Sequence, residues 1–61
     1  MKYYNMKSVY GIETIDEINR KDYISYKEYR KELIRLMKEY IMCGMDVYIS
    51  SRSTKDWREK N

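Results

Sequence analysis

Three groups of residues in this 61-residue chain have side chains that could take part in catalysis: a lone cysteine, two adjacent carboxylates, and a run of hydroxyls and cations. Cys43 precedes Gly44, where a helix is expected to end, and the negative end of a helix dipole disfavours a thiolate. Asp16 and Glu17 are better explained as stabilising the start of a helix. Histidine, the commonest general base near neutral pH, is absent from the sequence. We therefore expect no catalytic residues and predict that the protein is not an enzyme.

The third group, SSRSTK at residues 50–55, lies where a strand is expected to lead into a helix. Backbone amides exposed at such a place can bind an anion, but no glycine opens this loop as a phosphate cradle requires. We interpret the run as a helix-capping segment, with an anion or partner contact as the alternative. One cysteine without any histidine leaves a zinc site almost without ligands, so neither a metal nor a cofactor is expected.

Aromatic and basic side chains offer binding chemistry instead, and their spacing predicts two strands. Residues 2–10 (KYYNMKSVY) alternate with a period of two, which is typical of a strand, and Gly11 would end it. Residues 45–50 (MDVYIS) alternate in the same way, with apolar residues on one side. If the two strands pair, tyrosines and cations gather on one open face. We expect four residues of this face to bind a partner: Tyr3, Lys7, Tyr48 and Arg52.

The most strongly patterned element is a helix within residues 24–44. Ser25 and Glu28 form a capping box, Ile24 and Tyr29 have the spacing of a hydrophobic staple, and Gly44 suits the left-handed residue after a helix. At about 100° per residue, the large apolar side chains gather in one arc that would face the core. This arc contains Tyr26, Tyr29, Leu33, Leu36, Met37 and Tyr40.

Two isoleucines of this helix, Ile34 and Ile41, lie outside the core arc and beside the cations Arg30 and Lys38. Apolar β-branched residues on the solvent side are poor choices for helix propensity and solubility. One interpretation is that a short helix or the tail covers them. The other is that all four residues form an apolar patch with a basic rim, and on this basis we expect them to bind a partner.

Two shorter helices complete the predicted fold. Thr14 and Glu17 match a second capping box, which predicts a helix of about two turns before residue 22. The tail is expected to form a helical turn that lays Trp57 over the core. The prediction is one α+β domain spanning residues 1–61, with the order β-α-α-β-α and a two-stranded sheet packed on one long amphipathic helix.

Length and charge limit how such a chain can work. A chain this short buries only about 60% of the surface its unfolded form exposes, and one cysteine cannot form an internal disulfide. The remaining remedies are association and unusually good packing; we expect association, as a homodimer with sheets joined edge to edge. Thirteen basic and ten acidic residues give a net charge of +3 with the signs interspersed, which is a weak signal for nucleic acid. The apolar stretches are short and no signal peptide is apparent, which favours a cytoplasmic protein with no membrane segment.

The residue usage also resembles that of small proteins encoded by phages and mobile elements. Ala, Pro, Phe, His and Gln are absent, while residues encoded by AT-rich codons are frequent. We therefore expect a non-catalytic interaction protein that binds another macromolecule, most concretely a phage- or mobile-element-encoded inhibitor of a host protein. The alternative is a small dimeric nucleic-acid-binding regulator that uses the basic helix face or the sheet.

Overall fold

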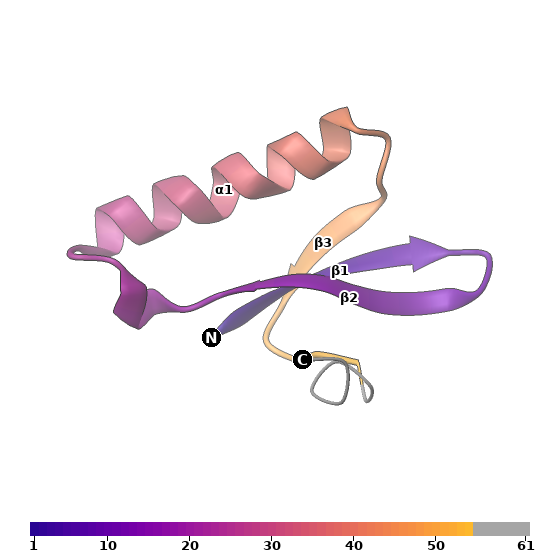
Figure 1. Ribbon diagram of the computed structural model, residues 1–61, viewed down its shortest axis with the longest axis horizontal. Helices are drawn as coiled ribbons and strands as arrows, with labels where there is room; N and C mark the ends of the chain where they lie inside the picture. The colour runs from indigo at the N-terminus through magenta and orange to yellow at the C-terminus, as the bar shows by residue number, and fades with distance from the viewer. Residues whose placement is uncertain (55–61) are drawn as a thin grey trace.

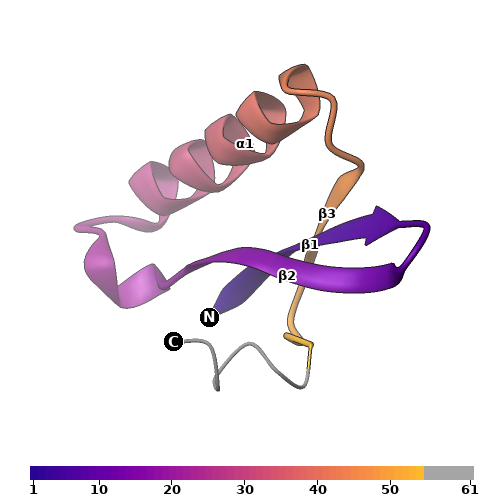
Figure 2. The same ribbon diagram turned by 45° about the vertical axis from the view of Figure 1, so that its right-hand side comes forward.

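A computed structural model describes residues 1–54, which fold into a three-stranded antiparallel sheet with a helix over one face (Figures 1 and 2). The sheet has the order β2-β1-β3, so the first strand of the chain is central. The α+β class is confirmed, but the two-stranded sheet and the order β-α-α-β-α are wrong. The elements in chain order are β1 (Lys2–Ser8), β2 (Gly11–Ile18), the 3₁₀ turn η1 (Arg20–Asp22), α1 (Tyr26–Met42) and β3 (Val47–Ser50).

The segment predicted as a short helix is strand β2, which explains the error in the sheet. Four of the eight residues of GIETIDEI are Ile or Thr, whose β-branched side chains favour strands. A two-turn helix is marginal without support, whereas β2 pairs with β1 through seven residue pairs. Thr14, expected to cap a helix, is buried in mid-strand. Cross-strand pairing therefore outweighs the local capping pattern.

A tight connection joins β1 to β2. Ser8 pairs with Gly11, which leaves Val9 and Tyr10 at the tip, and the Tyr10 N–H donates to Ser8 Oγ at 3.2 Å. Gly11 has a φ of +112°, which only glycine adopts without strain. The glycine predicted to end the first strand thus turns the chain into the next one. Further along, the register shifts so that Ile15 bulges between two paired residues, and its side chain packs against the core.

Helix α1 has the predicted ends. Ser25 Oγ accepts the Glu28 N–H at 3.2 Å, which confirms the N-cap. At the other end Gly44 has a φ of +86°, the Gly44 N–H donates to Ile41 O at 3.0 Å, and the Met45 N–H donates to Tyr40 O at 3.1 Å. These two bonds form a Schellman motif. The predicted staple is absent, because the side chain of Ile24 is fully exposed.

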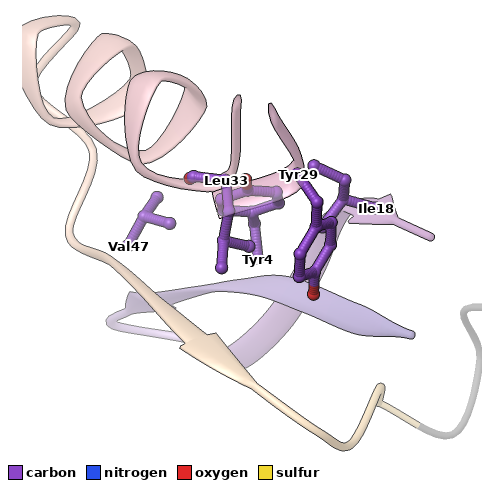
Figure 3. Close-up of a cluster of buried hydrophobic side chains, with 5 residues drawn as sticks. All are labelled: Tyr4, Ile18, Tyr29, Leu33 and Val47. Carbon is purple, nitrogen blue, oxygen red and sulfur yellow. Dashed lines mark hydrogen bonds between the residues drawn. The ribbon is translucent and has the colours of Figure 1, made fainter. Parts of the chain in front are cut away.

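The core lies between α1 and the helix-facing side of the sheet (Figure 3). Its buried members come from all four major elements: Tyr4, Ile18, Tyr29, Leu33 and Val47. Tyr4 is completely buried, and its hydroxyl donates to Leu33 O at 2.7 Å. The buried hydroxyl therefore has a hydrogen-bond partner, and its burial leaves no polar group unsatisfied. The predicted core arc of the helix is correct for Tyr29 and Leu33, and for Leu36, Met37 and Tyr40, which are partly buried against the same cluster. Tyr26 is instead 56% exposed and lies under the guanidinium of Arg20.

The opposite face of the sheet is partly covered by residues 51–54, which we call the strap. Asn5 Nδ2 donates to Arg52 O at 3.0 Å, and the Thr54 N–H donates to Thr14 Oγ1 at 2.8 Å. Beneath the strap, Thr14 Oγ1 donates to Asn5 Oδ1 at 2.6 Å. The strap thus crosses from β3 over β1 to β2. Thr54, predicted to cap a terminal helix, binds β2, while the predicted helix itself and Trp57 lie outside the described residues.

Candidate interaction surfaces

The strap divides the predicted binding face of the sheet into a covered half and an open half. Tyr3 lies in the covered half and is only 9% exposed. Arg52 belongs to the strap and is exposed, but its carbonyl is held by Asn5. Lys7 and Tyr48 lie in the open half, where the Lys7 ammonium is 5.4 Å from the centroid of the Tyr48 ring. The structure therefore brings Lys7 and Tyr48 together and removes Tyr3 from the accessible surface.

The tip of the β1–β2 hairpin extends the open half with residues that were not predicted. The side chains of Val9 and Tyr10 are 93% and 97% exposed, and Ile12, which pairs with Lys7, is 54% exposed. The signal that would have found the tip is Gly11 directly after two turn residues, once β2 is recognised as a strand. We call Lys7, Val9, Tyr10, Ile12 and Tyr48 the hairpin surface.

On α1, the four predicted partner-binding residues lie where the helical wheel placed them. Ile41 is 51% exposed, Ile34 is half-buried, and Arg30 and Lys38 are exposed. The short helix that would have covered the isoleucines does not exist. Among residues 1–54, an apolar strip with cations beside it therefore lies on the outer side of the helix.

The charges of α1 are segregated between its two flanks. Arg35 donates to Glu32 and, at 3.0 Å, to Glu39, so the three residues form an ion-pair network on one flank. The hydrogen bond from Arg35 holds the pKa of Glu32 below its ordinary value. Within residues 1–54 no ion pair involves the remaining helix cations, which are Lys27, Arg30, Lys31 and Lys38. The outer face of the helix is therefore basic.

The carboxylates and the cysteine occupy structural positions. Asp16, expected in the first turn of a helix, lies on β2 and accepts the Tyr40 hydroxyl at 2.6 Å and the Glu17 N–H at 2.8 Å. Cys43 is the exposed C-cap residue of α1. A carboxylate held by two donors and a lone thiol at a helix C-terminus do not form an acid–base pair or an activated nucleophile.

Residues 1–54 give little support for a ligand pocket, a metal site or a membrane-spanning helix. A solvent-exposed hollow of about 410 Å³ beside the start of α1 contains two carboxylates but no cation and no buried polar group, so its chemistry does not favour a particular ligand. Among these residues, no three His, Cys, Asp or Glu side chains gather as metal ligands. The described helices are all too short or too polar to cross a membrane.

Comparisons with protein families, with curated proteins and with solved structures find no match to this chain.

Proposed function

We propose that this protein is a non-catalytic interaction protein that binds another protein through the hairpin surface. The observation that carries the proposal is the nearly complete exposure of Val9 and Tyr10 at the end of a paired hairpin. Contiguous exposed apolar residues mark interaction sites on small soluble proteins. Tyrosine is also among the residues that contribute most to binding energy at protein interfaces.

The geometry of the hairpin favours a concave partner with an apolar pocket and an acidic rim. The turn is held by Ser8 Oγ, which accepts the Tyr10 N–H and donates to Gly11 O at 3.3 Å. Such a turn loses little further entropy on binding. Tyr10 supplies the side chain that enters the pocket, and the Lys7 ammonium, held near Tyr48, supplies a cation for a carboxylate at the rim.

A protein that acts in this way works by occupying a surface of its partner. An inhibitor of a host protein, encoded by a phage or a mobile element, is the most concrete form of the proposal. The codon bias behind the residue usage supports this form.

The test is affinity capture from cell lysate with three matched baits: the wild-type protein, the double variant Val9→Ser with Tyr10→Ser, and Met42→Ser as a control. Met42 is also apolar and 87% exposed, but it lies at the end of α1. We expect the wild type and the control to capture the same protein and the hairpin variant to lose it, with unchanged circular dichroism in all three. Equal capture by all three baits would overturn the proposal.

Nucleic-acid binding is the second candidate, favoured by the four cations of α1 that make no ion pair within residues 1–54. Cations of this kind bind phosphates and give a steep salt dependence. The carboxylate of Asp46, which lies opposite Lys7 at the start of β3, counts against a nucleic acid on the sheet. Fluorescence anisotropy with random DNA and RNA decides the matter: binding that weakens steeply with salt and is lost in Lys27→Glu with Lys31→Glu would favour this candidate.

A further inference from the structure

The two edges of the sheet differ in whether their backbone groups are occupied. On the outer edge of β2, the Thr14 N–H donates to Thr54 Oγ1 of the strap at 3.3 Å. The Glu17 N–H on the same edge donates to the side chain of Asp16 at 2.8 Å. Side chains therefore take the place of a neighbouring strand along β2, which is a common way of protecting a sheet edge.

The edge of β3 has no such protection within residues 1–54. The Lys7 N–H donates to Asp46 O at 3.0 Å, just beyond the pairing of Met6 with Val47. Because hydrogen-bonded and non-hydrogen-bonded pairs alternate in an antiparallel ladder, Val47 and Ile49 direct their backbone groups away from β1. These groups form an open edge along which another strand can pair.

The apolar strip of α1 lies on the same side of the molecule as this open edge. In Figures 1 and 2, α1 runs from left to right above the sheet, and strand β2 passes in front of β3. Because α1 is right-handed and directs Tyr29 and Leu33 toward the sheet, its ion-pair flank faces the β2 side. Ile34 and Ile41 lie about 160° around the helix from Glu32 and Glu39, on the β3 side.

We propose that this open edge and apolar strip form one interface whose occupant is a second copy of the chain. Two β3 strands pair antiparallel across a two-fold axis, so that the two three-stranded sheets become continuous. The two α1 helices then lie side by side and antiparallel, with Ile34 of one copy against Ile41 of the other. This interface is separate from the hairpin surface and does not depend on the proposed function.

Spacing supports a second copy as the occupant. Among the strands, α1 contacts β3 most closely. Its core contacts with Tyr4 of β1 and Val47 of β3 place α1 over these two strands, about one strand spacing from the two-fold axis, so its symmetry mate lies two spacings away, about 10 Å. This value is the usual distance between packed helices. Pairing of the strands therefore brings the two apolar strips into contact.

Charge complementarity also favours self-pairing. β3 is preceded by Asp46, and Arg52 of the strap comes two residues after its end; both residues are exposed. In an antiparallel pair of identical strands, the acidic end of each copy lies beside the basic end of the other. Arg30 is likewise placed beside the C-terminal end of the partner's helix, where the dipole favours a cation.

Sedimentation equilibrium from low-micromolar to millimolar protein tests the proposal. We expect the wild type to approach twice the chain mass of 7.6 kDa. Ile41→Glu should weaken self-association about tenfold or more, because it places a carboxylate in the apolar strip. Met42→Glu, which lies about 100° around the helix from Ile41 and outside the apolar strip, should not. A wild type that stays monomeric at millimolar concentration, or equal effects of the two variants, would overturn the proposal.

A charge exchange provides a second test that does not require an altered helix. Asp46→Arg alone and Arg52→Asp alone each place like charges at both ends of the paired strands, so each variant should associate less than the wild type. An equimolar mixture should recover dimerisation as a heterodimer, since opposite charges then meet at both ends of the paired strands. If the mixture associates no better than either variant alone, the antiparallel β3 pairing is wrong.

Discussion

At the scale of single residues, the hydroxyls of the tyrosines explain why the core contains no phenylalanine. The sequence has eight tyrosines and no phenylalanine. Tyr4 is completely buried and donates to Leu33 O, while the half-buried Tyr40 donates to Asp16 of β2. Each hydroxyl ties the helix to the sheet through a directional bond in addition to apolar contact. In a domain with one helix over a three-stranded sheet, such bonds fix where the helix lies.

The Tyr40–Asp16 bond predicts a stability loss in alkaline solution. The bond, followed by burial, raises the pKa of Tyr40 from 10.0 to about 12, and burial raises the pKa of Tyr4 as well. Because the folded protein holds these protons more tightly than the unfolded chain, the stabilisation is complete below pH 10 and is lost as the pH rises toward 12. Urea denaturation of the wild type should show this decline.

Tyr40→Phe should be less stable at neutral pH by about 1–2 kcal/mol, because it leaves one side of Asp16 without its donor. Its stability should also decline less between pH 10 and 12 than that of the wild type. Tyr26→Phe is the matched control, since the Tyr26 hydroxyl makes no hydrogen bond within residues 1–54. Parallel pH curves for the wild type and Tyr40→Phe would contradict the assigned role.

At the scale of elements, groups close together in the sequence define the ends of α1, whereas contacts between distant parts of the sequence make β2 a strand. Both ends of α1 could be predicted, because the capping groups Ser25 and Gly44 lie within a few residues of the groups they satisfy. The pattern around Thr14 looked equally local, but its hydroxyl bonds to Asn5 and Thr54, nine and forty residues away. A capping box identified in the sequence takes account only of nearby residues and not of such distant partners. The strap was missed for the same reason.

The strap itself depends on Thr14, and this gives a prediction at the element scale. Thr14→Val keeps the shape of the side chain but removes the hydroxyl that serves both Asn5 and Thr54. Unsatisfied buried polar groups cost about 1–3 kcal/mol, so urea denaturation should show a loss of this size. Hydrogen exchange at the Thr54 amide should also become faster. Ser51→Ala, which removes an exposed bond to Lys2, should change neither quantity.

At the scale of the whole molecule, the fold is a plate with one helix over one sheet, with extents of 36, 27 and 16 Å. A plate of this thickness buries few side chains completely, and among the described residues only Tyr4 is less than 2% exposed. The sequence predicted that burial would be scarce and placed the tyrosines and cations on one sheet face. It could not predict which part of that face the strap covers, because the strap ends on β2, which the sequence did not identify as a strand. Among residues 1–54, the hairpin surface and the edge of β3 are the parts of the sheet that stay uncovered.

A chain with so little burial should gain stability from its own concentration if β3 and the apolar strip are joined in a dimer. Because unfolding then separates two chains, the urea midpoint of the wild type should rise with protein concentration. Ile41→Glu should have a midpoint that does not depend on concentration and that equals the wild-type value extrapolated to high dilution. The hairpin variant Val9→Ser with Tyr10→Ser should follow the wild-type curve, because the hairpin surface is outside the dimer contact. A concentration-independent wild-type midpoint would mean that a single chain is stable without a second copy. Both the hairpin surface and the β3 edge would then be available to other partners.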